Sequence, residues 1–267
     1  YMATYMAYCG ASVAQIMKRG RWQSDAWKVY VKALICHASD RGADKHYHYL
    51  KRTIRMTALL PWQASAWQRV CVQIADGKMP HGILLAGPPD SGKANFAAGL
   101  AAYLLCQGHS KPCGECRQCN LVTAGTHPDL LEVTLEDSKQ IRIEQIRALI
   151  HWATQTAQQG GYKVCTINPA DKLNNQSANA LLKVLEEPPP NTLICLVSDQ
   201  PMRLLPTLRS RCQRIELGTP SQQEAVLWLQ GQLDSSADIE LLLSIAGGMP
   251  LRVLDAAYHQ QCSVAIQ

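Results

Sequence analysis

Short apolar runs alternate with helical patterns along the middle of the chain. The apolar runs predict strands over residues 82–86, 129–133, 163–167 and 193–198. Apolar residues at spacings of three and four predict helices over about 63–76, 93–105, 141–156 and 177–185. Strands that alternate with helices indicate an α/β fold with a parallel sheet.

The pattern changes at Pro220, after which it predicts helices only. Ser221 and Glu224 have the spacing of a capping box. A further helix over about 237–246 would end at Gly247 and Gly248. We therefore expect a small helical lid domain over 221–267, an α/β domain over 56–220, and a separate extension over 1–55.

The composition is that of a folded protein outside membranes. Of the 267 residues, 47% are hydrophobic and 18% are charged, which allows a buried core and about two domains. No run approaches the ~18 apolar residues of a membrane-spanning helix, and no leader resembles a secretory signal. We expect a cytoplasmic protein with no membrane partner.

Basic residues are concentrated near the amino terminus. Residues 1–55 hold 10 lysines and arginines against 3 aspartates, whereas residues 56–267 hold 16 against 18 acidic residues. The excess behind the net charge of +5 therefore lies in the first fifth of the chain. Such a segment is either a solvated extension or a surface that attracts nucleic acid.

The first predicted strand leads into a glycine-rich segment, which reads Gly87-Pro88-Pro89-Asp90-Ser91-Gly92-Lys93-Ala94. In a P-loop of this kind, backbone N–H groups and the lysine hold phosphates, and a Ser or Thr hydroxyl after the lysine holds Mg²⁺. Gly87, Gly92 and Lys93 fit nucleotide binding, but Ala94 has no hydroxyl. We expect a degenerate loop that binds ATP weakly or not at all.

A working ATPase also needs acidic residues after a strand next to the P-loop strand. After the run 163–167 the sequence has Asn168 and Pro169 instead. An amide is a poorer metal ligand than a carboxylate, and proline cannot act as a base. We expect no hydrolysis by this chain; the alternative is an autonomous ATPase that uses Lys93, with Asp171 replacing the missing acid.

Four of the eleven cysteines are clustered in a short segment, at Cys106, Cys113, Cys116 and Cys119. Thiolates two residues apart can reach one ion from a tight turn, and the first cysteine, at a helix end, can complete a tetrahedral site. One structural zinc ion is the preferred interpretation. An iron–sulfur cluster and free buried thiols are the alternatives.

Other polar residues carry little signal by themselves. Arg209, Arg211 and Arg214 have the pattern of a solvated basic patch. The segment His127-Pro128-Asp129 indicates a turn rather than a catalytic pair, because no Ser or Cys nucleophile is evident beside it.

Several segments together resemble the delta-prime family of the bacterial DNA polymerase III clamp loader. The resemblance runs from Met56 to about residue 260. Its most specific parts are the four-cysteine insert and the segments 124–129, 177–189 and 208–212. It implies an AAA+ protein with a RecA-like α/β domain, a zinc module over 106–119 and a helical lid. It also implies a subunit that does not itself hydrolyse ATP.

The resemblance further implies a role in DNA replication. A delta-prime-type subunit supports ATP-dependent loading of the sliding clamp on primed DNA, with the gamma/tau motor and delta subunits as partners. The chain alone would catalyse nothing, but it would be part of a DNA-directed DNA polymerase holoenzyme, a nucleotidyltransferase, at the nucleoid. Arg211 would be an arginine finger that enters the ATP site of a neighbouring subunit.

Two features depart from this family. The turn Gly248-Met249-Pro250-Leu251 places Leu251 where catalytic relatives carry a lid arginine, and Arg252 follows one position later. The family's third domain, which builds a pentameric collar, would be missing because the sequence stops at Gln267.

Residues 1–55 resemble a different family. The segment 10–25 and Tyr30 are similar to the C-terminal end of a tyrosine recombinase, where Trp22 would match the active-site His or Trp and Tyr30 the nucleophile. The arginines that activate the scissile phosphate would lie upstream, so we expect this segment to be chemically inert. The alternative is a DNA-binding protein that works through residues 1–55.

Overall fold

The computed structural model describes residues 59–136, 138–233 and 238–255. All of them lie in one compact unit, which extends from Ala58 to His259. The predictions for residues 1–55, including Trp22 and Tyr30, lie outside the described residues.

The described unit is built on a parallel sheet with the strand order β2-β3-β4-β1-β5. The strands are Gly82–Ala86 (β1), Leu130–Val133 (β2), Lys163–Ile167 (β3), Thr192–Ser198 (β4) and Gln213–Glu216 (β5). Every residue of β1 and β4 is buried, as expected of strands covered on both faces. β1 and β4 pair from Gly82 opposite Ile194 to Ala86 opposite Ser198, so the two strands end together. The loops after β1 and β4 therefore start side by side at the carboxyl edge of the sheet.

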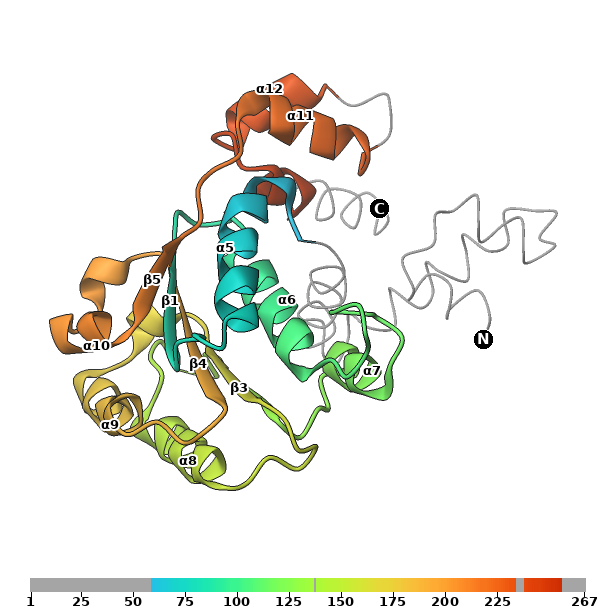
Figure 1. Cartoon of the computed structure of the whole chain (residues 1–267). Helices are drawn as coiled ribbons and strands as arrows, with labels where there is room; N and C mark the ends of the chain where they lie inside the picture. The colour runs from blue at the N-terminus through green and yellow to red at the C-terminus, as the bar shows by residue number, and fades with distance from the viewer. Residues whose placement is uncertain (1–58, 137, 234–237, 256–267) are drawn as a thin grey trace, which may run out of the picture. The chain divides into compact units, whose positions relative to one another are not determined.

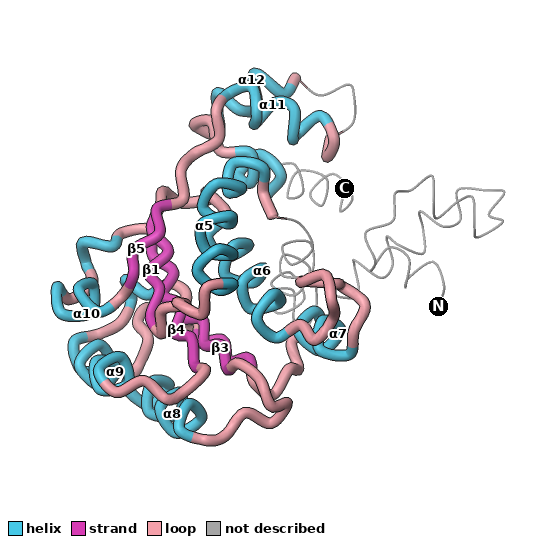
Figure 2. The backbone as a smooth tube through the Cα atoms, in the orientation of Figure 1, coloured by secondary structure: helices cyan, strands magenta, loops and turns pink. Residues whose placement is uncertain are grey.

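Helices cover both faces of the sheet (Figures 1 and 2). One face carries α5 (Ala64–Ala75), α6 (Lys93–Leu105) and α7 (Arg117–Ala124), and the other carries α8 (Ile143–Thr154), α9 (Asn175–Glu186) and α10 (Pro206–Arg211). Buried aliphatic side chains fill the space under α8 and α9, among them Leu84, Ile146, Leu149, Leu181, Leu185 and Leu196. The predicted α/β fold with a parallel sheet is confirmed.

The element boundaries differ from the predicted ones in a few places. The helix predicted over 141–156 is shorter because Ile141 bonds to the backbone of Lys172 and pairs with Leu173, outside the helix. The sequence did not predict β5, which has three polar residues and buries only Ile215. It also missed α10 and α7, because a helix of six residues and a helix inside a cysteine-rich insert show no long apolar period.

The helical region after the sheet also follows its predicted pattern. Ser221 and Glu224 form the expected capping box at the start of α11 (Gln222–Gln230). The next helix, α12 (Ile239–Ile245), is followed by Gly247 and Gly248, whose φ angles of +65° and +79° end it. Helical backbone resumes at Pro250. Within the ranges that the structure describes, no helix has the length and apolar character needed to cross a membrane.

Candidate functional site

The P-loop joins the end of β1 to the start of α6, as the sequence predicts. Gly92 has a φ of +86°, and a Cβ on it would lie 2.2 Å from Leu60 Cδ1 and 2.7 Å from Gln63 Nε2. A Cβ on Gly87 would lie 2.6 Å from the carbonyl oxygen of Leu217. Both glycines are therefore required by close packing around the loop, in addition to any ligand.

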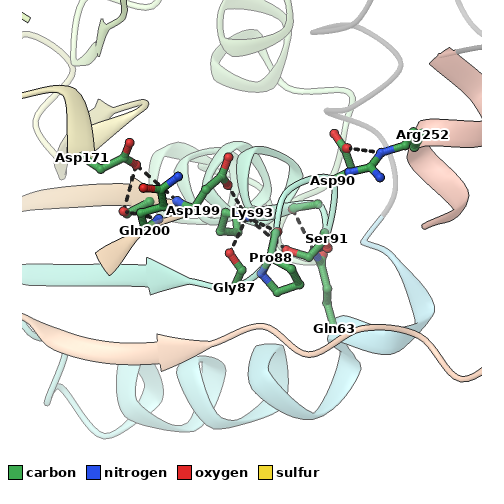
Figure 3. A network of polar contacts seen from close by, with 12 residues as sticks. Gln63, Gly87, Pro88, Asp90, Ser91, Lys93, Asp171, Asp199, Gln200 and Arg252 are labelled. Atoms are coloured by element: carbon green, nitrogen blue, oxygen red, sulfur yellow. Dashed lines mark hydrogen bonds and ion pairs between the residues drawn. The ribbon is translucent and has the colours of Figure 1, made fainter. Parts of the chain in front are cut away.

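The 3-10 helix η1 (Pro61–Gln63) contacts the P-loop through hydrogen bonds from two of its side chains. Trp62 Nε1 donates to the carbonyl of Ser91 at 3.0 Å, and Gln63 Nε2 donates to the carbonyl of Gly92 at 2.8 Å. Figure 3 shows Gln63 beneath the loop. No pattern in the sequence marks these two contacts, because their partners are backbone carbonyls about thirty residues away.

Lys93 is buried at the start of α6, with a relative exposure of 4%. Its Nζ donates to the carbonyl oxygens of Gly87, at 3.0 Å, and of Pro88, and to Ser91 Oγ at 3.3 Å. It also forms an ion pair with Asp199 Oδ1 at 2.7 Å (Figure 3). The lysine that the sequence assigns to phosphate binding is thus bonded to groups of its own chain.

Asn168, Pro169 and Asp171 lie between β3 and β4. Asn168 and Pro169 follow β3, next to η2 (Ala170–Lys172). Asp171, the alternative acid, accepts hydrogen bonds at Oδ1 from Ser198 Oγ, at 2.9 Å, and from the backbone N–H of Asp199, at 3.3 Å. These bonds give Asp171 a structural role at the end of β4.

The lid residues Leu251 and Arg252 both face the P-loop. A Cβ on Gly92 would lie 3.5 Å from Leu251 Cδ1, so the leucine packs over the loop. Arg252 Nε donates to Asp90 Oδ2 at 3.0 Å (Figure 3). Arg252 therefore contacts the loop through a carboxylate of the loop itself.

Arg211 lies far from the P-loop of its own chain. Its carbonyl oxygen would be 3.3 Å from a Cβ on Gly82, the first residue of β1, whereas the P-loop follows the last residue of that strand. The guanidinium is partly exposed, pairs with Glu186 Oε1 at 2.7 Å and donates to the carbonyl of Thr207 at 3.1 Å. The contacts of Arg211 therefore lie near the amino end of β1, away from the P-loop of its own chain.

The neighbouring arginines have other contacts. Arg209 Nη1 bonds to Met202 Sδ at 2.8 Å, and Arg214 pairs with Glu216 Oε1 at 2.6 Å within β5. The three arginines that form a patch in the sequence are thus distinguishable in the structure.

The four cysteines of the insert converge on one point. Their sulfur atoms all lie within 4.8 Å of one another. Cys106 and Cys113 are 3.5 Å apart, Cys113 and Cys119 are 3.9 Å apart, and Cys106 and Cys116 are 4.0 Å apart. A regular tetrahedron with Zn–S bonds of about 2.3 Å has sulfur atoms about 3.8 Å apart. The donor set therefore fits one tetrahedral zinc ion, as the spacing predicts.

Backbone N–H groups around the insert point at these sulfur atoms. The N–H of Cys119 lies 3.4 Å from Cys116 Sγ, and this bond is the main cause that lowers the pKa of Cys116 to about 6. Backbone bonds likewise lower the pKa of Cys113, whereas burial raises the pKa of Cys119 to about 12. Donors that favour thiolates prepare the insert for a cation.

The insert is fastened to the α/β domain by hydrogen bonds to one loop. Gln118 Nε2 donates to Gln159 Oε1 at 3.0 Å, and Gln107 Nε2 donates to the carbonyl of Gln159 at 3.3 Å. The buried carboxylate of Asp129 in turn accepts from the backbone N–H groups of Gln158 and Gln159, both at 2.8 Å. The segment His127-Pro128-Asp129 forms the predicted turn, and Asp129 has a structural role in it.

The fold and these sites define a P-loop α/β domain with an insert whose four thiols can hold a metal ion. Residues 62–221 match the family model described as DNA polymerase III, delta subunit, and the chain belongs to this family.

Curated relatives agree with this assignment. A Pseudomonas aeruginosa protein named DNA polymerase III subunit delta' is 42% identical over 201 residues, which cover 73% of this chain and 60% of the relative. The Escherichia coli protein of the same name is 38% identical over 195 residues, which cover 71% of this chain and 58% of the relative. The chain thus spans about 60% of the length of these relatives.

Solved structures also resemble the chain. A Thermotoga maritima protein related to the DNA polymerase III gamma subunit matches with a TM-score of 0.46 and 24% identity, over 61% of this chain and 51% of that one. The RuvB Holliday junction branch migration motor of Thermotoga maritima matches with a TM-score of 0.47 and 16% identity, over 73% of this chain and 58% of that one.

Proposed function

We propose that this chain is a delta-prime-type subunit of a bacterial DNA polymerase III clamp loader. It supports ATP-dependent loading of the sliding clamp on primed DNA and does not hydrolyse ATP itself. Its partners are the gamma/tau motor and delta subunits, and it reaches the clamp and the DNA through that complex. It works in the cytoplasm at the nucleoid.

The observation that carries this proposal is the combination of family membership with a disabled P-loop. The matched residues 62–221 include the loop, the cysteine insert and Arg211. Lys93 is bonded to its own loop and to Asp199, Ala94 offers no hydroxyl, and Asn168 and Pro169 follow β3. A chain with these features binds ATP weakly or not at all and contributes to the assembly in another way.

Arg211 is the residue through which the chain acts on ATP. Its position at the amino edge of the sheet, away from its own P-loop, suits an arginine supplied to a neighbouring subunit. A guanidinium offers paired N–H donors to phosphate oxygens and stabilises the charge that develops during phosphoryl transfer. Arg211 is therefore an arginine finger acting in trans.

The four-cysteine insert has a structural role. Cys106, Cys113, Cys116 and Cys119 would hold one zinc ion, which cross-links the segment between α6 and α7. The insert then presents Gln118 to the loop that Asp129 holds. The domain division that we propose is an extension over 1–55, an α/β domain over 56–220 with its zinc module at 106–119, and a lid over 221–267.

Co-purification tests this proposal. The chain, with and without residues 1–55, should be retained by tagged motor and delta subunits, and its ATP turnover should stay at background. Lys93→Ala should leave both results unchanged. A turnover near ~1 s⁻¹ by the isolated chain, the low end for ordinary enzymes, would instead support an autonomous ATPase.

A further inference from the structure

Two carboxylates stand beside the P-loop, and each has a different cation as its partner. Asp90, within the loop, has a φ of +59° and pairs with Arg252 of the lid. Asp199, just after β4, pairs with Lys93 (Figure 3). Of the two, only Asp199 therefore binds Lys93, the side chain that would bind a phosphate.

Among the residues that the structure describes, Asp199 is the single anion that accepts from the Lys93 ammonium. An ammonium has three protons, and four acceptors surround this one: two carbonyl oxygens, the Ser91 hydroxyl and the Asp199 carboxylate. An anionic phosphate would have to replace one of them, and the carboxylate is its direct electrostatic competitor.

The structure also holds Asp199 in place for this contact. β1 pairs with β4 along the whole length of β1, and the two strands end together, so Asp199 and the P-loop both follow strand ends at the same edge of the sheet. The backbone N–H of Asp199 donates to Asp171 Oδ1, which fixes the start of its loop. The carboxylate is 43% exposed, so it can turn to water without burying an unpaired charge.

We infer that the P-loop is a latent site for a linear polyphosphate chain, such as the triphosphate of a nucleotide, which Asp199 keeps closed by acting as an internal counter-ion of Lys93. When the charge of Asp199 is removed, Lys93 and the loop become available to the phosphates. This inference rests on the proposal that the unaltered chain binds ATP weakly or not at all.

Calorimetric titration of the whole chain with ATP, and separately with inorganic tripolyphosphate, tests the inference. EDTA is present because Ala94 offers no hydroxyl for magnesium. Asp199→Asn should bind both ligands more tightly than the unaltered chain, by up to about fivefold, which is the ratio for the upper end of a part-exposed ion pair. Asp199→Ala, checked for folding by circular dichroism, should do the same.

Two controls identify the cause of the gain. Asp76→Asn removes an exposed carboxylate that pairs with Lys78 in the loop leading into β1, at the other edge of the sheet. This variant should leave the affinity for ATP and for tripolyphosphate unchanged. Adding Lys93→Ala to Asp199→Asn should abolish the gain in affinity.

The two ligands identify what the site recognises. A gain in affinity for both ligands assigns the site to the phosphate chain, and a gain for ATP alone assigns it to nucleoside triphosphates.

The results that overturn the inference are distinct from those that overturn the proposed function. Equal, weak binding by the unaltered chain and by Asp199→Asn contradicts only the role of Asp199. Equal, low-micromolar binding by both contradicts the weak nucleotide binding of the proposed function as well. A gain that survives Lys93→Ala places the phosphates elsewhere and overturns the inference.

Discussion

Arg211 Nη2 lies 2.7 Å from Glu186 Oε1, so the guanidinium is held against the end of α9. Its second contact, to the carbonyl of Thr207, lies within α10. Both contacts are on exposed groups, where an ion pair contributes little to stability, about 0–1 kcal/mol. Loss of the Arg211 side chain should therefore affect function far more than folding.

We expect Arg211→Ala to lower the DNA- and clamp-stimulated ATPase of a reconstituted loader while leaving folding and bound zinc intact. An arginine supplied in trans raises phosphoryl-transfer rates by ~10³–10⁵ in the best-measured GTPases. Only the partner site facing this subunit would lose it, so total turnover should fall in part and clamp loading should fall further.

The matched control is Arg209→Ala, which removes the same charge two residues away together with the contact to Met202. Arg211→Lys should rescue poorly, because an ammonium lacks the paired donors. Identical behaviour of Arg209→Ala and Arg211→Ala would show that the arginines are only a basic patch.

The cysteine insert should contain one zinc ion per chain, measured by elemental analysis of the purified protein. Structural zinc contributes an apparent ~10–16 kcal/mol in finger peptides, so chelation should unfold the insert. Hydrogen exchange should then rise over 106–124, whereas β1 and β4 stay protected. Absence of zinc, or an iron chromophore, would refute the assignment.

His127 should make the stability of the domain depend on pH. The side chain is 4% exposed, and its desolvation lowers the pKa of the imidazole below its usual range. The unfolded chain therefore binds more protons below about pH 6.5, and the free energy of unfolding should decrease as pH falls through that range. Urea titrations at pH 7.5 and 5.5 measure this change.

The control for this prediction is His127→Asn, whose amide oxygen can replace Nδ1 as the acceptor of the Asp129 N–H. This variant should lose most of the pH dependence between 7.5 and 5.5. If it keeps the full dependence, another group is responsible.

Gly92→Ala should destabilise the domain by about 3 kcal/mol, because its Cβ would collide with Leu60 and Gln63 and its φ is positive. Gly77→Ala is the matched control. It also has a positive φ, of +66°, but no atom lies within 4 Å of its Cβ, so only about 1 kcal/mol is expected. Equal losses in urea denaturation would show that packing around the P-loop contributes nothing.

The sequence predicted the parts of the fold that depend on local patterns. β1 and α6 have the predicted limits because a buried apolar run and a glycine-rich turn mark them. The cysteine cluster was predictable because its spacing alone brings the thiols together. Each of these signals lies within a short stretch of chain.

Contacts between distant segments were not predictable in this way. Asp199 reaches Lys93 only because β4 pairs with β1, and no local pattern marks that aspartate. Gln63 holds the P-loop through carbonyl groups, which every residue has. β5 has one buried residue, too few to show a period. All three features depend on packing between segments that are distant in the sequence.

The most direct test is a chimera in which the part of this chain that matches the Pseudomonas aeruginosa relative replaces the corresponding part of that relative. The measurement is the rate of clamp loading on primed DNA by motor and delta subunits combined with the chimera. We expect loading to continue, and to continue equally when the chimera carries Lys93→Ala. A folded chimera that fails to support loading, or one whose loading Lys93→Ala abolishes, would contradict the proposal of a non-hydrolysing clamp-loader subunit.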